Sequence, residues 1–178
     1  MSSNVKKLVF CAIAIALSMV TSFIKFTSLP FGGSITLFSM FFICLIGYLY
    51  GVKAGVMTGV AYGILQFLVD PYIYGPIQVL LDFPLAFGAL GLSGFFKKPK
   101  YGLAVGCIFG MTGRYICHVV SGYIFFADYA PEGMNPVFYT AGYNLTYILP
   151  EMVATLVLIS VPAVAKGLNQ VKRMAITE

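Results

Sequence analysis

Polar side chains that could do chemistry are few in this chain, and three of them lie inside strongly apolar stretches: Asp82, His118 and Asn144. An ionisable group at membrane depth marks a functional site by default, because hydrocarbon cannot solvate it. The carboxylate of Asp82 would attract an organic cation. The imidazole of His118, the only histidine, can stack and form hydrogen bonds, and the amide of Asn144 can both donate and accept. The three side chains suit a small heterocyclic cation.

Helical spacing adds neighbours to these three residues. Gln78 lies four residues before Asp82 and therefore on the same helical face. Aromatic rings fall near the outer ends of the same stretches, and ring faces attract cations. The rings in question are Phe126 and a stripe formed by Tyr139, Tyr143 and Tyr147. The sequence thus predicts an outward-facing cleft lined by aromatic rings.

Other interpretations of these residues stay open at this stage. A lone histidine in a membrane helix is also typical of structural hydrogen bonding, and tyrosine stripes are typical of packing or of anchoring at the membrane interface. Arg114 and Glu151 fall at comparable depth on neighbouring predicted helices, so we expect them to form an ion pair. That pair would be structural.

Composition identifies the class of protein that must position these groups. Of the 178 residues, 60% are hydrophobic and 10% are charged, whereas a soluble domain carries about 25% charged residues. The chain is therefore expected to be an integral membrane protein and a single domain over residues 1–178. Its net charge of +5 does not indicate a nucleic-acid partner, because the basic residues lie between apolar segments. The four cysteines show no C-x-x-C or metal-ligand spacing, so we expect small buried side chains.

The apolar segments predict an all-α bundle of six transmembrane helices, since each crossing needs about 20 residues. The segments cover residues 5–26, 34–50, 52–69, 76–96, 101–127 and 137–166. Loops rich in proline and glycine separate most of them. The first segment follows two lysines, as in a signal peptide, but no small-residue cleavage site follows it, so a retained helix is expected.

Charge distribution predicts the orientation. If six helices alternate, nearly all basic loop residues fall on one side, which places both termini in the cytoplasm. These residues are Lys6, Lys7, Lys53, Lys97, Lys98, Lys100, Lys166, Lys172 and Arg173. The acidic residues Asp70, Asp128 and Glu132 fall outside.

Small residues recur at helical spacing. Glycines every fourth residue, from Gly47 to Gly63 and from Gly102 to Gly110, predict close packing between helices. Ala12 and Ala16 show the same spacing near the cytoplasmic end of the first helix and could equally face a partner subunit. The chain has no phosphate-binding loop, so energy for uphill transport would have to come from another chain.

The chain resembles the thiamine-specific substrate-binding subunits (S components) of energy-coupling-factor vitamin transporters. The likeness runs in order through nearly the whole chain. It is carried by Gly32-Gly33-Ser34, Gly51 to Gly55, Gln78 to Phe83, Gly91-Leu92-Ser93-Gly94, Arg114-Tyr115, His118 to Gly122, Phe125-Phe126, Ala130 to Gly133 and Tyr139 to Tyr147.

The resemblance implies roles for the candidate residues. Asp82 would face the thiazolium ring, His118 and Phe126 would surround the aminopyrimidine, and Asn144 would form hydrogen bonds with it. Tyr139 and Tyr72 would complete the pocket, with Gln78 and Phe83 beside Asp82.

The family also implies partners. Ala12 and Ala16 match the motif that docks such subunits on the shared transmembrane coupling protein, which works with two ATPases in the bacterial cell membrane. The subunit itself would catalyse nothing and hold no cofactor. The loop between the first two helices would close over the ligand as a lid, with Gly32 and Gly33 as its hinge.

Some features depart from the family pattern. Some relatives carry Glu at position 82, Tyr at 83 and Trp at 126, where this chain has Asp82, Phe83 and Phe126. The alternatives are therefore an S component for another vitamin or for a pyrimidine precursor of thiamine. An integral membrane enzyme acting on lipid through Asp82, His118 and Tyr139 is a third possibility.

Overall fold

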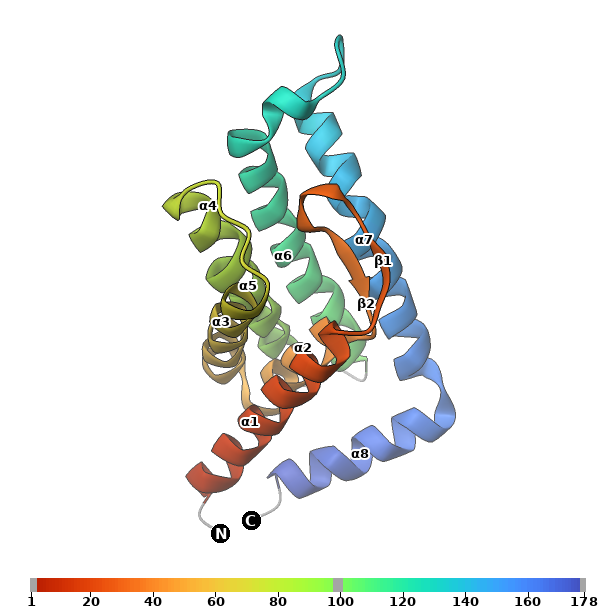
Figure 1. Ribbon diagram of the computed structural model, residues 1–178. Helices are drawn as coiled ribbons and strands as arrows, with labels where there is room; N and C mark the ends of the chain where they lie inside the picture. Colours follow the sequence, from red (N-terminus) through yellow and green to blue (C-terminus); the bar gives the residue numbers. More distant parts are fainter. Residues whose placement is uncertain (1–2, 98–100, 177–178) are drawn as a thin grey trace.

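The computed structural model describes residues 3–97 and 101–176, and Figure 1 shows a helical bundle with one small hairpin. In chain order the elements are α1 (Ser3–Ser22), β1 (Lys25–Ser28), η1 (Pro30–Gly32), β2 (Ser34–Thr36), α2 (Ser39–Tyr50), α3 (Val52–Val69), α4 (Pro76–Leu80), η2 (Leu81–Leu85), α5 (Ala86–Ala89), η3 (Leu90–Phe96), α6 (Gly102–Phe125), η4 (Ala127–Tyr129), α7 (Pro136–Ser160) and α8 (Pro162–Ile176).

Five helical spans of the described chain are long and apolar enough to cross a membrane, which confirms a multi-pass membrane protein. They are α1, α3, the continuous run Pro76–Phe96, α6 and α7. The second predicted segment, 34–50, is wrong in extent, because its first residues form β2 and only the 12-residue α2 is helical. Such a helix is about 18 Å long, which is less than the roughly 30 Å of the hydrocarbon core.

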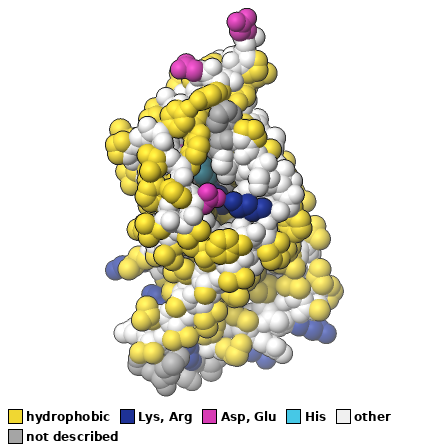
Figure 2. Space-filling model, in the orientation of Figure 1, with side chains coloured by type: hydrophobic (Ala, Val, Ile, Leu, Met, Phe, Trp, Pro, Cys, Tyr) yellow, Lys and Arg dark blue, Asp and Glu magenta, His cyan; other side chains and the backbone are white. Residues whose placement is uncertain are grey.

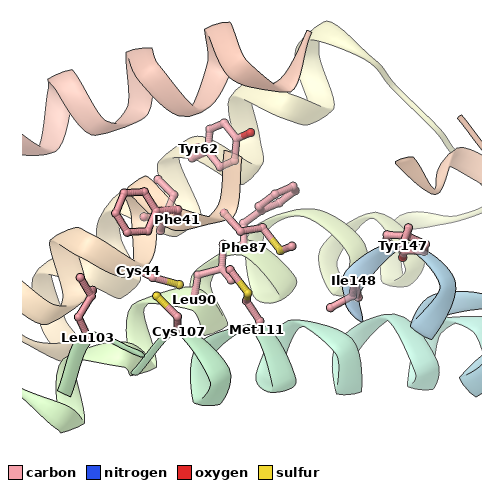
Figure 3. Close-up of a cluster of buried hydrophobic side chains, with 12 residues drawn as sticks. Phe41, Cys44, Tyr62, Phe87, Leu90, Leu103, Cys107, Met111, Tyr147 and Ile148 are labelled. Carbon is pink, nitrogen blue, oxygen red and sulfur yellow. The ribbon is translucent and has the colours of Figure 1, made fainter. Parts of the chain in front are cut away.

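Helix α2 is the centre of the fold, with most of its side chains buried. Figure 3 shows Phe41 and Cys44 of α2 packed against Phe87, Leu90 and Met111, with Tyr62 and Tyr147 at the edges of the same cluster. Of the cysteines, Cys44 and Cys107 are buried as expected, whereas Cys11 and Cys117 are half-buried, and all four are free thiols.

Glycines of α3 and η3 bring two backbones into contact. A Cβ at Gly91 would lie 2.0 Å from the Val56 nitrogen, and one at Gly59 would lie 2.2 Å from the Phe87 carbonyl oxygen. No side chain fits at these distances. The glycine spacing therefore serves internal helix packing, as the sequence predicts.

The span from Pro76 to Phe96 is continuous but irregular. Its second part, η2, is a π-helical turn that contains Pro84. Proline has no backbone N–H, so one backbone hydrogen bond of the helix is missing here. The wider π turn accommodates the missing bond. The π turn carries Asp82, so the local distortion decides where this carboxylate points.

The last predicted segment, 137–166, is wrong beyond Ser160. Val161 adopts an extended conformation (φ −66°, ψ 124°), which residues before a proline favour, and Pro162 then begins α8. Helix α8 runs across the end of the bundle at which α1 begins (Figure 1).

Charges separate along the bundle. Figure 2 shows acidic side chains at one end and basic side chains toward the other. The surface between them is mostly apolar, with one acidic and one basic side chain near its middle. The start of α1 and the end of α8 share the basic end (Figure 1). This agrees with termini on one side of the membrane, although Lys98 and Lys100 lie outside the described residues.

Candidate functional site

A cavity of about 210 Å³ opens between the hairpin and the helices α1, α3, α4, α6 and α7. All eight predicted ligand-binding residues line it: Tyr72, Gln78, Asp82, Phe83, His118, Phe126, Tyr139 and Asn144. Elements distant in sequence thus bring the candidate residues around one cavity.

Three side chains form hydrogen bonds with the carboxylate of Asp82 in the cavity. The Gln78 amide and the Ser121 hydroxyl donate to its Oδ2 over 2.6 and 2.9 Å, and His118 Nδ1 lies 3.0 Å from its Oδ1. The side chain of Asp82 is 15% exposed. These donors hold the carboxylate in one orientation while one edge still faces the cavity.

The contact with Arg114 indicates which nitrogen of the His118 imidazole carries the proton. Its Nε donates to His118 Nε2 over 3.2 Å. Because a guanidinium can only donate, Nε2 must accept, and the proton of a neutral imidazole then lies on Nδ1 and is donated to Asp82. The His118–Asp82 contact is therefore a hydrogen bond from a neutral ring to an anion, which leaves the negative charge of Asp82 intact.

The predicted ion pair between Arg114 and Glu151 is wrong. The Arg114 guanidinium lies 4.2 Å from the centre of the Phe87 ring. Glu151 instead accepts hydrogen bonds from the Thr36 backbone and hydroxyl, the Ser39 hydroxyl and the Met40 backbone, over 2.8–3.3 Å. The buried carboxylate thus caps the N-terminus of α2 and ties β2 to α7, because anions are stabilised at helix N-termini.

Asn144 is buried, and its amide forms hydrogen bonds with neighbouring protein groups. Its Nδ2 donates to the Thr140 carbonyl oxygen over 2.9 Å, and its Oδ1 accepts from the Tyr147 hydroxyl over 2.5 Å. An amide oxygen has two lone pairs. The second lone pair of Oδ1 is available to a donor on a bound ligand.

Aromatic rings form the outer rim of the cavity. Tyr72 and Phe126 stack with their centroids 5.9 Å apart, and the edge of Tyr74 meets Phe126 at 4.7 Å. The hydroxyls of Tyr74 and Tyr129 form a hydrogen bond above them. Burial, followed by the proximity of Tyr129 and Asp82, raises the pKa of Tyr72, so its phenol is neutral at physiological pH. The rim is thus built of aromatic ring faces.

The hairpin of β1 and β2 borders the cavity. The sequence predicts instead the end of the helix 5–26, a Pro/Gly loop and the start of the helix 34–50, so both helix ends are wrong here. Gly32 adopts φ +88° at its tip, and the backbone N–H of Gly33 donates to the Tyr143 hydroxyl over 3.2 Å. The Tyr143 hydroxyl in turn donates to the Pro30 carbonyl oxygen. At the base of the hairpin, Lys25 and Asp70 form an ion pair of 2.9 Å, and Figure 2 shows an acidic and a basic side chain in contact in the middle of this face.

Several cavity residues were missed from the sequence. Ser121 lies three residues after His118, so helical spacing could have placed it on the same face. Arg114 was interpreted as structural, although its spacing of four from His118 was the available signal. Lys25 and Asp70 are far apart in sequence, and no local pattern connects them. Outside the cavity, Ala12 and Ala16 lie exposed on the outer surface of α1.

Comparison with known proteins gives consistent matches. The model of a family described as "Thiamine transporter protein" matches residues 8–170. A protein of Bacillus subtilis named thiamine transporter ThiT is 34% identical over 168 residues, which cover 85% of this chain and 87% of the relative. A second ThiT, from Lacticaseibacillus paracasei, is 27% identical over 128 residues, covering 65% of this chain and 60% of that protein.

A solved structure of ThiT from Listeria monocytogenes superposes on this chain with a TM-score of 0.72 at 26% sequence identity. The match covers 92% of this chain and 98% of the solved one.

Proposed function

This chain belongs to the thiamine transporter protein family, and from that membership we infer that it is the thiamine-binding subunit of a bacterial vitamin importer. It is a multi-pass protein of the cell membrane. Its relatives are transporters, so the alternative of a lipid-modifying enzyme is set aside. Thiamine is bound as cargo rather than as a cofactor. The whole chain acts as one domain, since the described helices pack around α2.

The observation that carries the proposal is the anchored carboxylate of Asp82 in a ring-lined cavity. Thiamine carries a permanent positive charge on its thiazolium ring. Three fixed donors orient Asp82, so its negative charge is already positioned when the cation arrives. Fixed charges in a site shielded from water interact more strongly than in solution.

The remaining candidate residues suit the other half of the ligand. The free lone pair of Asn144 Oδ1 accepts a hydrogen bond from the amino group of the pyrimidine. His118, Phe126, Tyr72 and Tyr139 supply ring surfaces, and Phe83 and Gln78 support Asp82 from the same helix. Flat rings between aromatic faces gain stacking and cation–π energy.

We expect the energy for transport to come from partners. The family resemblance implies a coupling protein in the membrane and two ATPase subunits. The exposed pair Ala12 and Ala16 on α1 supports docking there, because small residues let helices approach closely. The proposed arrangement has six membrane segments with both termini in the cytoplasm.

Titration calorimetry of the purified chain tests the ligand. We expect tight binding of thiamine, and weaker binding of both the isolated hydroxymethyl-pyrimidine and the isolated thiazolium alcohol, since each half fills only part of the site. If the pyrimidine alone matches thiamine in affinity, the chain is a precursor importer. If neither it nor thiamine binds, the cargo is another vitamin.

A further inference from the structure

A second cavity lies at the basic end of the bundle, in the groove between α1 and α3. It holds about 330 Å³ and shares no lining residue with the thiamine cavity. We call it the α1–α3 groove, and its walls are Asn4, Lys7, Leu8, Cys11, Ile15, Lys53, Ala54, Met57, Thr58 and Ala61.

The inner part of the α1–α3 groove is apolar. Leu8, Cys11 and Ile15 form one stripe along α1, and Met57 and Ala61 continue along α3. Leu8 and Met57 are 70% and 64% exposed, so no protein side chain of the described structure covers them. An apolar furrow of this kind between two membrane helices suits an acyl chain.

The mouth of the groove is positively charged. Lys7 and Lys53 stand on its two sides, with the amide of Asn4 between the same helices. Helices α1 and α3 both begin here, and the N-terminus of a helix carries partial positive charge.

Within residues 3–97 and 101–176, no acidic side chain lines the groove beside these lysines. The carboxylates of the described chain belong to Asp70, Asp82, Asp128, Glu132 and Glu151, and none of them lines the groove. Among the described residues, Lys25 forms an ion pair with Asp70, and neither Lys7 nor Lys53 forms one with a carboxylate.

We propose that the α1–α3 groove binds one anionic phospholipid. The phosphate lies between Lys7 and Lys53, and one acyl chain runs past Leu8 and Met57 toward Ile15 and Ala61. A free phosphate would leave the apolar furrow empty, and a zwitterionic lipid would bring no net charge to the two lysines. Ala12 and Ala16 are absent from the lining, so the lipid occupies a strip of α1 beside the proposed docking surface.

Native mass spectrometry of the purified chain tests this site, with phosphatidylglycerol or phosphatidylcholine added in equal amounts. We expect one phosphatidylglycerol molecule to survive mild activation, and phosphatidylcholine to be lost. The double variant Lys7→Gln/Lys53→Gln removes two interactions with an anionic headgroup, so retention of phosphatidylglycerol should fall at least about fivefold. The variant Lys166→Gln/Arg173→Gln removes the same charge from α8 and should retain the lipid.

A steric variant covers the case in which the charge variant fails to fold. Ala61 is exposed at the apolar end of the groove, and Ala61→Phe should fill the furrow and displace the lipid without altering any charge. Equal retention of phosphatidylglycerol by the wild type and both groove variants would overturn the proposal. So would groove variants that keep the lipid but lose assembly with the coupling protein, because the groove would then be a protein interface.

Discussion

The proposed binding role of Asp82 depends on the residues that hold its carboxylate. An exposed carboxylate would attract a cation only weakly in water, whereas Gln78, Ser121 and His118 fix this one at the wall of a half-buried cavity. Gln78 also connects the carboxylate to the outer loop, since its Oε1 accepts from the Tyr74 backbone over 2.9 Å.

Replacing Gln78 tests this support. Gln78→Leu keeps the volume but removes a hydrogen bond to a charged group, which is worth roughly 1.5–3 kcal/mol. We expect thiamine affinity to fall about tenfold or more in calorimetry, while the chain still folds. The control Gln170→Leu, on the exposed side of α8, should bind like the wild type, and equal affinity in both variants would rule out a positioning role for Gln78.

Glu151 is a structural carboxylate, for which the sequence wrongly predicts an ion pair with Arg114. Its Oε2 accepts hydrogen bonds from Thr36 at the end of β2, and its Oε1 accepts from Ser39 and Met40 at the start of α2. In Glu151→Gln an NH2 group replaces one carboxylate oxygen. This new donor then faces existing donors, either those of Ser39 and Met40 or those of Thr36. We expect a loss of roughly 2 kcal/mol or more in stability, seen as a lower thermal midpoint in detergent.

Glu132 on the exposed outer loop provides the control for Glu151. Glu132→Gln should melt with the wild type. An unchanged midpoint for Glu151→Gln would show that the cap contributes nothing to stability.

At the scale of elements, we propose that the hairpin is the part of the site that opens. It contacts α7 through Gly33, whose α-carbon leaves no room for a side chain. A Cβ there would lie 2.8 Å from the Tyr143 hydroxyl and 2.9 Å from the buried Tyr147 ring. The closed position therefore depends on glycine at this point.

We predict that Gly33→Ala accelerates release of thiamine several-fold. The methyl group pushes the hairpin away from α7, so the closed state is less populated, whereas binding to the open state changes little. Stopped-flow tyrosine fluorescence measures this, since the chain has no tryptophan. Gly142→Ala on α7, with nothing within 4 Å, is the control, and equal release rates would contradict a lid role.

Elements differ in how far sequence could predict them. The long helices α3, α6 and α7 follow from apolar length, and the convergence of Asp82, His118 and Asn144 follows from depth along helices. The hairpin could not be predicted, because its strands are short and are held by α7 through Tyr143 and Glu151, which are more than 100 residues away. The break before Pro162 had a local signal, but the π turn at Asp82 depends on how the bundle accommodates Pro84.

At the scale of the whole molecule, basic side chains gather toward the end of the bundle where α1 begins, and we propose that the exposed surface of α1 docks the partner subunits. Ala12 and Ala16 are exposed there, far from the thiamine cavity. On this proposal, ligand binding and partner docking use two separate surfaces of one chain.

Enlarging Ala12 and Ala16 should impair docking on the partner without affecting thiamine binding. We expect Ala12→Leu/Ala16→Leu to lose co-purification with the coupling protein, because the bulk prevents close helix approach, while thiamine affinity stays at the wild-type level. Ala163→Leu, exposed on α8, should assemble normally. Normal assembly of the α1 variant would place the docking surface elsewhere.

The most direct test of the central claim is a double comparison by calorimetry, of thiamine against an uncharged thiazole analogue, in the wild type and in Asp82→Asn. We predict that the wild type prefers thiamine by about tenfold or more, since a charge-assisted contact contributes roughly 1.5–3 kcal/mol. Asp82→Asn should lose this preference, and the exposed variant Asp128→Asn should keep it. An Asp82→Asn chain that still prefers the charged ligand by the wild-type factor would contradict the account.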